Sequence, residues 1–171
     1  MSYMKQRVKK KQHNSRNCLV CGMKNELGLK AFFYEVENGE LVAIFKPHEE
    51  HQSYPGRLHG GIASAILDET IGRAIIINNE NIWGVTVELN IKYKKPIPLD
   101  QELRVIARIT KDSKRLFEGT GEILLENGDI AVTACGKYMK IPINKIADFN
   151  EEVEEWKVII TNNEPNEIEM L

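Results

Sequence analysis

The sequence predicts an α+β fold in which an antiparallel sheet wraps around one long central helix. Six segments show the apolar pattern of β-strands, whereas only one segment is long and apolar enough for a buried helix. The last four strands follow one another directly and must cover one face with apolar side chains. The single helix is the only element available for this, so we expect it to lie in the concave side of the sheet.

The turns between the strands support this order of elements. Asn38-Gly39 separates the first two strands and Asn127-Gly128 separates the last two, and Asn-Gly between apolar runs is a strong hairpin signal. Apolar and polar residues alternate strictly from 85 to 93, which places Thr86 on the polar face of that strand. The expected elements are strands at 29–34 and 41–45, a helix at 60–78, and strands at 85–93, 103–109, 116–125 and 130–141.

The chain has 171 residues, which fits one domain with tails. We expect a basic N-terminal arm at 1–20, the folded domain at 21–146, and an acidic tail at 147–171 that is disordered or forms a short helix at 153–160. Blocks of like charge are typical of solvated tails.

The balance of 23 basic and 25 acidic residues argues against nucleic acid or an anionic membrane as the main partner. No apolar stretch is long enough to span a bilayer, and three cysteines do not indicate a disulfide framework. We therefore expect a cytoplasmic protein with reduced thiols.

Two adjacent carboxylates, Asp68 and Glu69, stand inside the apolar helix, where burying an unpaired charge costs several kcal/mol. Glu69 has a partner in Arg73, four residues on, in the favourable order for a helical ion pair. The neighbours of Asp68 on its own face are small, with Ile71 the exception, and Ser64 among them is a candidate substrate-binding residue. The Asp68 carboxylate either accepts from backbone amides where another chain segment approaches closely, or it faces a substrate.

The residues before the helix favour the substrate site. His59-Gly60-Gly61 stands where a loop enters the helix, and glycines there bring unpaired N–H groups, with the positive end of the helix dipole, close to a ligand oxygen. Such amides stabilise a carbonyl oxygen that becomes an oxyanion. Asp68, two and a half turns along, is placed to attack the carbon or to activate a water.

These two motifs give the chain a resemblance to the hotdog-fold acyl-CoA thioesterases, in particular to the phenylacetate-type and thioesterase-superfamily-member branches. The matching stretches are 56–68 and 85–99, and the likeness covers about residues 27–142. The resemblance implies that Gly61 or Gly60 donates to the thioester carbonyl, that His59 shapes the pocket, and that Asp68 is the nucleophile or general base. It also implies that Thr86 comes from the other subunit, so that the active site spans the interface of a homodimer, alone or within a homotetramer.

The chain departs from some relatives at Ser53, where they place an Asn that is a second donor to the thioester carbonyl. Gln52 or Ser53 is expected to substitute, since losing one such donor typically costs about 10²–10³ in rate. Lys94 and Lys95, at a strand end, are candidates for binding the phosphates of coenzyme A. Coenzyme A enters only as part of the substrate, and we expect no separate cofactor.

Cys18-Leu19-Val20-Cys21 has the spacing of a zinc half-site or a redox pair, but a tetrahedral metal needs two more ligands, which the neighbouring sequence does not supply. We expect a structural role for these cysteines and no metal. His51, in an acidic loop, is considered only as a residue that lines the pocket.

Two other functions compete with hydrolysis. A non-catalytic acyl-CoA-binding regulatory module would use the same pocket. A hydratase or dehydratase would need a His that exchanges a proton with the acyl chain, and nothing in the sequence favours that arrangement. The sequence thus predicts an acyl-CoA thioesterase with Asp68 at its centre.

Overall fold

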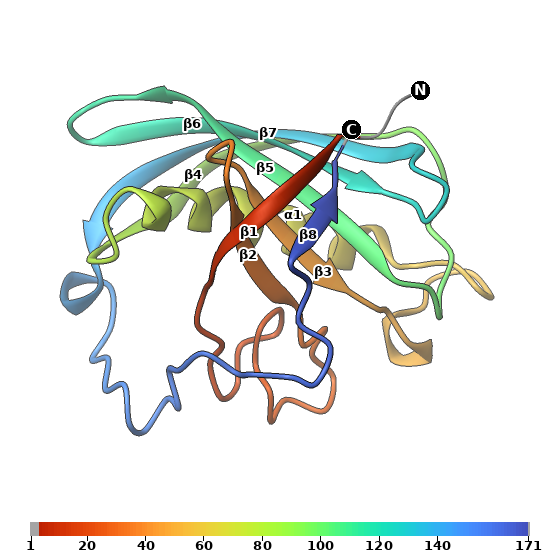
Figure 1. The fold of residues 1–171 in the computed structure, drawn as a ribbon, viewed down its shortest axis with the longest axis horizontal. Helices are drawn as coiled ribbons and strands as arrows, with labels where there is room; N and C mark the ends of the chain where they lie inside the picture. The colour runs from red at the N-terminus through yellow and green to blue at the C-terminus, as the bar shows by residue number, and fades with distance from the viewer. Residues whose placement is uncertain (1–3, 171) are drawn as a thin grey trace.

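The computed structural model describes residues 4–170 and has one eight-stranded antiparallel sheet that curls around a single long helix, α1 (Figure 1). The sheet order is β4-β7-β6-β5-β3-β2-β1-β8, so β4 forms one edge. The predicted fold class is confirmed. The strands are β1 (Lys5–Lys11), β2 (Phe32–Val36), β3 (Leu41–Phe45), β4 (Ile82–Tyr93), β5 (Leu103–Asp112), β6 (Leu116–Leu124), β7 (Ile130–Pro142) and β8 (Glu167–Glu169).

Helix α1 (Gly60–Arg73) fills the concave side of the sheet and continues as the 3-10 turn η2 (Ala74–Ile77), so the predicted helix is confirmed with a tighter last turn. Its side chains at Ile66, Leu67 and Ile71 are fully buried. The helix approaches β6 so closely that a Cβ at Gly119 would lie 2.7 Å from Ile71 Cγ2. Two further 3-10 turns are η1 (Glu49–His51) and η3 (Ile143–Lys145).

The expectation of solvated tails is wrong, because residues 5–11 and 167–169 form strands of the sheet. The basic segment forms β1, which pairs with β2 on one side and with β8 on the other. Lys11 lies over the ring of Phe32 at 3.8 Å and binds Glu164 at 2.7 Å. The basic N-terminal and acidic C-terminal segments therefore neutralise each other in the fold, a pairing that one-dimensional charge blocks do not reveal.

The segment 147–160 does not form the short helix considered for 153–160; it runs as turns and irregular chain (Figure 1). Trp156 anchors it by stacking on His13 and by packing against Trp83, with ring centroids 5.4 and 4.9 Å apart. Phe149 also packs on Trp83. These contacts hold the segment against the start of β4.

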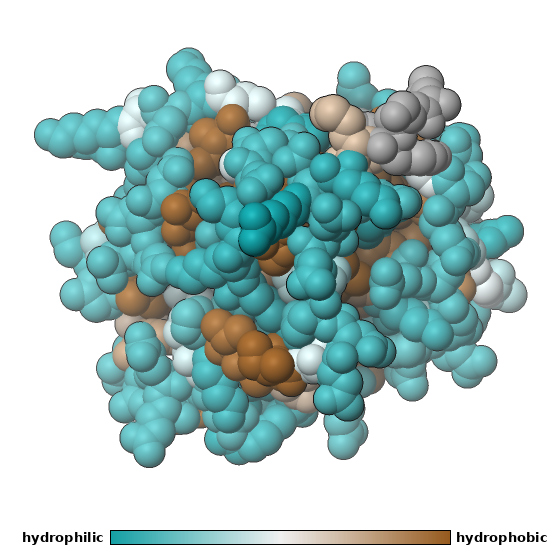
Figure 2. Space-filling model, in the orientation of Figure 1, coloured by the Kyte–Doolittle hydropathy of each residue, from teal (hydrophilic) through white to brown (hydrophobic). Residues whose placement is uncertain are grey.

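The face of the molecule drawn in Figure 2 is mainly hydrophilic, with hydrophobic residues in separate patches. Within residues 4–170, no helix combines the length and the apolar character that crossing a membrane requires.

Candidate active site

The start of α1 presents one free amide. His59 is the N-cap residue, and its Nδ1 accepts the N–H of Gly61 at 2.9 Å. The Gly60 carbonyl accepts from the hydroxyls of Ser64 and Tyr93, at 3.0 and 2.9 Å. Among residues 4–170 no partner is found for the N–H of Gly60, the first residue of the helix, where no intrahelical partner exists. The structure thus separates the two glycines: Gly61 serves the cap, and Gly60 has the amide available to a ligand.

His51 holds the start of helix α1 in place. Its ring is buried, with 3% exposure; Nδ1 accepts the N–H of His48 at 3.0 Å, and Nε2 lies 2.8 Å from the carbonyl oxygen of Leu27. The carbonyl of His51 accepts the N–H of His59 at 2.9 Å. His51 therefore has both ring nitrogens occupied and orients the cap; it does not line either cavity described below.

Asp68 receives two hydroxyl hydrogen bonds on one carboxylate oxygen. Thr86 Oγ1 donates to Asp68 Oδ1 at 2.8 Å, and Tyr138 OH donates to the same oxygen at 3.1 Å. Burial, and then the negative charge of Asp68, raise the pKa of Tyr138, so this phenol stays protonated and remains a donor. The second carboxylate oxygen is left for a water or substrate. Asp68 is half-buried, not enclosed as its apolar surroundings in the sequence suggested.

A β-bulge explains why Thr86 faces the helix. Thr86 pairs with Tyr138 and Glu88 pairs with Lys137, so Val87 is an extra residue in β4 and its side chain is 55% exposed. A bulge reverses which residues face the core. Thr86 before it and Leu89 after it both turn toward α1, although the strict alternation in the sequence put them on opposite faces.

Thr86 meets Asp68 of its own chain, so these two residues belong to one half of the site, and the expectation that Thr86 completes the site of another subunit stays a prediction. The other half of the predicted site is far from Asp68. Gly60 stands eight residues earlier on the same helix, which separates the two by about 12 Å along the axis. A carbonyl held by the Gly60 amide is therefore out of reach of Asp68 in the same chain, because reacting atoms must approach to about 3–3.5 Å.

The two halves open into separate cavities that share no lining residue. Asp68 and Thr86 line a cavity of about 550 Å³. One wall of it is aromatic and comes largely from the C-terminal segment, for which the block of acidic residues predicts a tail. The aromatic residues are Trp83, Phe149 and Trp156.

Gly60 lines the second cavity, of about 370 Å³, together with Ser53, Lys94 and Lys95. Lys95 also pairs with Asp129 at 2.7 Å. Two other predicted substrate-binding residues lie outside this cavity and have structural partners. Gln52 accepts the N–H of Gly56 at 2.8 Å, and the Ser64 hydroxyl lies 2.7 Å from that of Tyr93.

Sequence reasoning missed Tyr138 and Tyr93. Each holds one half of the site, Tyr138 through Asp68 and Tyr93 through the Gly60 carbonyl. A signal for Tyr138 was available only from the strand pairing, in which it stands opposite Thr86 across β4 and β7.

Comparison with known proteins agrees with this fold and these motifs. The family model of the Thioesterase superfamily matches residues 55–132. Over 78 residues the chain is 31% identical to Acyl-coenzyme A thioesterase 13 of Homo sapiens, a stretch that covers 46% of this chain and 56% of that protein. Over 116 residues it is 32% identical to Acyl-coenzyme A thioesterase THEM4 of Mus musculus, covering 67% of this chain and 49% of that protein. The chain thus spans only about half the length of these curated relatives.

Solved structures show the same fold. The zebrafish thioesterase superfamily member 2 superposes with a TM-score of 0.61 at 24% identity, covering 69% of this chain and 86% of that one. The PaaI protein of the phenylacetic acid degradation operon of E. coli superposes with a TM-score of 0.60 at 17% identity, covering 66% and 80%. The chain has the hotdog fold, and its predicted resemblance to the thioesterase superfamily is confirmed.

Proposed function

We propose that this protein hydrolyses acyl-CoA thioesters to a free acid and coenzyme A. The observation that carries the proposal is the pair of complementary half-sites: an unpaired Gly60 amide at a helix N-terminus, and a carboxylate, Asp68, with one oxygen held by Thr86 and Tyr138 and the other free. The first suits a developing oxyanion and the second suits an attacking water. The named activity of the curated relatives supports the same reaction.

The reaction needs few groups. The Gly60 N–H donates a hydrogen bond to the thioester carbonyl oxygen and stabilises the negative charge that forms on it. A water bound to the free oxygen of Asp68 gives its proton to that carboxylate while its oxygen bonds to the carbonyl carbon. The C–S bond then breaks, and the coenzyme A thiolate leaves and takes up a proton. Direct attack by Asp68 would pass through an anhydride that water hydrolyses to the same products.

The 12 Å between the half-sites requires two copies of the chain, and the edge strand β4 suggests how they meet. Twelve residues long and unpaired on one side, it is a ready template for a second strand. In an antiparallel pairing about a two-fold axis at the middle of β4, where Leu89 or Asn90 stands opposite its own copy, Thr86 of one copy lies within one residue of Tyr93 of the other. Thr86 binds Asp68 and Tyr93 binds Gly60. This homodimer therefore brings the Asp68 half-site of each copy beside the Gly60 half-site of the other and forms two composite sites.

The two cavities then take different parts of the substrate. The cavity beside Gly60 carries Lys94 and Lys95, which suit the phosphates of coenzyme A, and the cavity beside Asp68 has the aromatic wall that suits an acyl group. Ser53 is the remaining candidate for a second carbonyl donor. The expected cytoplasmic location stays a prediction.

The test is turnover of straight-chain and aryl acyl-CoAs by the full chain. Turnover is monitored as the loss of thioester absorbance, because the three free cysteines would react with the thiol reagents of the alternative assay. Asp68→Asn should lower kcat by at least about 10²-fold. The matched control is Glu126→Gln, the same carboxylate-to-amide change on an exposed residue between β6 and β7, which should leave kcat unchanged. Tight acyl-CoA binding with no turnover of any substrate would overturn the proposal in favour of a binding module.

A further inference from the structure

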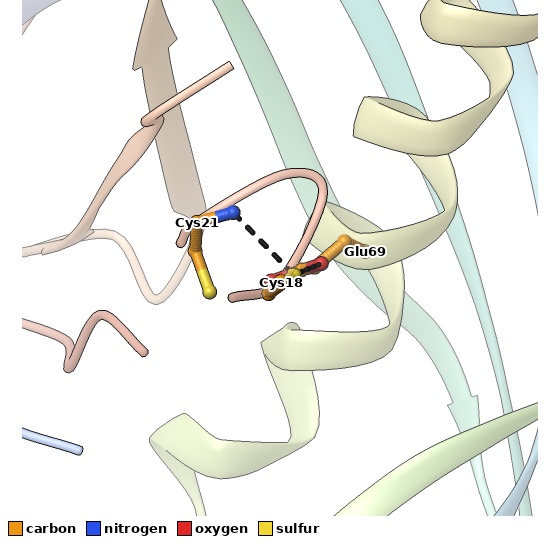
Figure 3. A group of neighbouring side chains, drawn as sticks. All are labelled: Cys18, Cys21 and Glu69. Carbon is orange, nitrogen blue, oxygen red and sulfur yellow. Dashed lines mark hydrogen bonds between the residues drawn. The ribbon is translucent and has the colours of Figure 1, made fainter. Parts of the chain in front are cut away.

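Three metal-ligating side chains meet beside the proposed active site, although one of them, Glu69, is 51 residues from Cys18 in the sequence. Cys18 and Cys21 lie in the loop before β2, and Glu69 reaches toward Cys18 from α1 (Figure 3). The two sulfurs and a carboxylate oxygen of Glu69 lie within 4.8 Å of one another, and Cys18 Sγ is 3.1 Å from Glu69 Oε2. In a tetrahedral zinc site two sulfurs stand about 3.8 Å apart, so small rotations suffice.

Both cysteine sulfurs already have outer partners that suit an anionic ligand. The N–H groups of Val20 and Cys21 donate to Cys18 Sγ at 3.3 and 3.4 Å. The hydroxyl of Ser15 lies 3.3 Å from Cys21 Sγ. Such second-shell contacts orient metal ligands and stabilise their charge.

Arg73 holds the third ligand in place. Its Nε and a terminal nitrogen both bind Oε1 of Glu69 at 2.9 Å, which leaves Oε2 directed at Cys18. The ion pair predicted from the i, i+4 spacing is thus confirmed, and it orients the carboxylate as a ligand with one free oxygen. Arg73 is itself fixed: its side chain is 6% exposed and another nitrogen donates to the carbonyl of His13 at 2.8 Å.

The charges balance with a divalent cation. Without metal, Glu69 and Arg73 neutralise each other and both thiols carry protons. A divalent cation adds two positive charges, and each thiol releases its proton to solvent as its sulfur bonds to the metal. The net charge of this largely buried cluster does not change, and Cys21, with 1% exposure, is not left as an unpaired thiolate.

We propose that Cys18, Cys21 and Glu69 bind one thiophilic divalent cation, of which Zn²⁺ is the representative, with water in the fourth position. All three residues line the cavity that also holds Asp68, which gives the ion an entry path and the water a place. The spacing of residues in the sequence did not reveal Glu69 as the third ligand, because only the fold brings it to the two cysteines. The ion would fasten the 15–22 loop to the helix that carries the catalytic carboxylate.

The test uses Co²⁺ as a spectroscopic probe and Zn²⁺ as competitor on the reduced full chain. We expect one Co²⁺ per chain, with thiolate-to-cobalt charge-transfer absorption that Zn²⁺ abolishes. Cys18→Ser, Cys21→Ser and Glu69→Gln should each weaken binding at least about 100-fold. Cys135→Ser is the matched control, because this thiol is exposed and lies outside the cluster; its affinity should equal that of the parent chain.

A melting curve with and without Zn²⁺ separates loss of the site from loss of the fold. The parent chain should melt higher with Zn²⁺, whereas the Glu69→Gln chain should stay folded and show no shift. Binding that survives both cysteine changes overturns the proposal. So does a chain that is isolated with a Cys18–Cys21 disulfide and, once reduced, binds no Co²⁺.

Discussion

The hydroxyl of Thr86 donates to the carboxylate of Asp68 at 2.8 Å within one chain, and the Val87 bulge in β4 makes this contact possible. The pair joins the edge strand to the central helix. Because Tyr138 donates to the same oxygen, the other oxygen of Asp68 is the one that can bind water. The contact therefore assigns Thr86 a positioning role: it holds the carboxylate and does not itself touch the thioester.

Removing the Thr86 hydroxyl should slow the chemical step without weakening substrate binding. Thr86→Val keeps the shape and loses a hydrogen bond to a charged group, so kcat should fall about 10- to 100-fold. KM should be unchanged, because the bond is not made to substrate. Thr86→Ser should retain most of the rate. Steady-state kinetics of the three chains decide this, and a rise in KM at constant kcat would contradict the assigned role.

The Gly60 amide can be removed without breaking the helix. Proline is well tolerated at the first helical position and has no N–H, so Gly60→Pro deletes the proposed oxyanion donor. We expect kcat to fall about 10²–10³-fold. Gly60→Ala is the control: it keeps the N–H and places a Cβ 3.5 Å from the Tyr93 ring, an ordinary contact. Circular dichroism checks the helix, and equal rates for both variants would exclude Gly60 as the donor.

Mixing two inactive variants tests whether the half-sites come from different copies. In a heterodimer of Gly60→Pro and Asp68→Asn, one of the two composite sites combines an intact Gly60 with an intact Asp68. Random re-association of equal amounts, after reversible dissociation, should restore about a quarter of the parent activity. If both residues acted within one chain, every site would lack one of them, and the mixture would stay inactive.

Local periodicity was sufficient to predict the helix, the strands from β2 to β7 and the Glu69–Arg73 pair, because each depends on neighbours in sequence. Asp68 and the glycines at the helix start were also recognisable, since a carboxylate in an apolar helix needs an explanation. The wrong face for Thr86 has a specific cause. A bulge adds one residue to a strand without changing the apolar alternation that the sequence displays.

The remaining errors concern contacts between distant segments. Cys18 and Glu69 are 51 residues apart, and no spacing rule links them. The charge blocks at the two ends look like solvated tails until β1 and β8 pair. Likewise, the aromatic wall formed by Phe149 and Trp156 depends on how the C-terminal segment folds back onto Trp83.

The docking of the C-terminal segment onto β1 should make stability depend on pH through Glu164. Burial acts to raise the pKa of Glu164, but hydrogen bonds from Lys11 and Thr161 outweigh it and hold this pKa at about 2, below the ordinary value of 4.5. A carboxyl group whose pKa is lower in the folded chain than in the unfolded chain stabilises the folded state at pH values above its unfolded pKa. That contribution is lost as the pH falls from about 4.5 toward 2.

Glu164→Gln should therefore lower the free energy of unfolding by about 2 kcal/mol near neutral pH, the usual worth of hydrogen bonds to a charged group. The difference from the parent chain should shrink steadily below about pH 4.5, because protonation removes the same charge from the parent. Urea unfolding at a series of pH values measures it, with the exposed Glu152→Gln as control. A difference that stays constant down to about pH 3 would mean that Glu164 stabilises the chain through its shape and not through its charge.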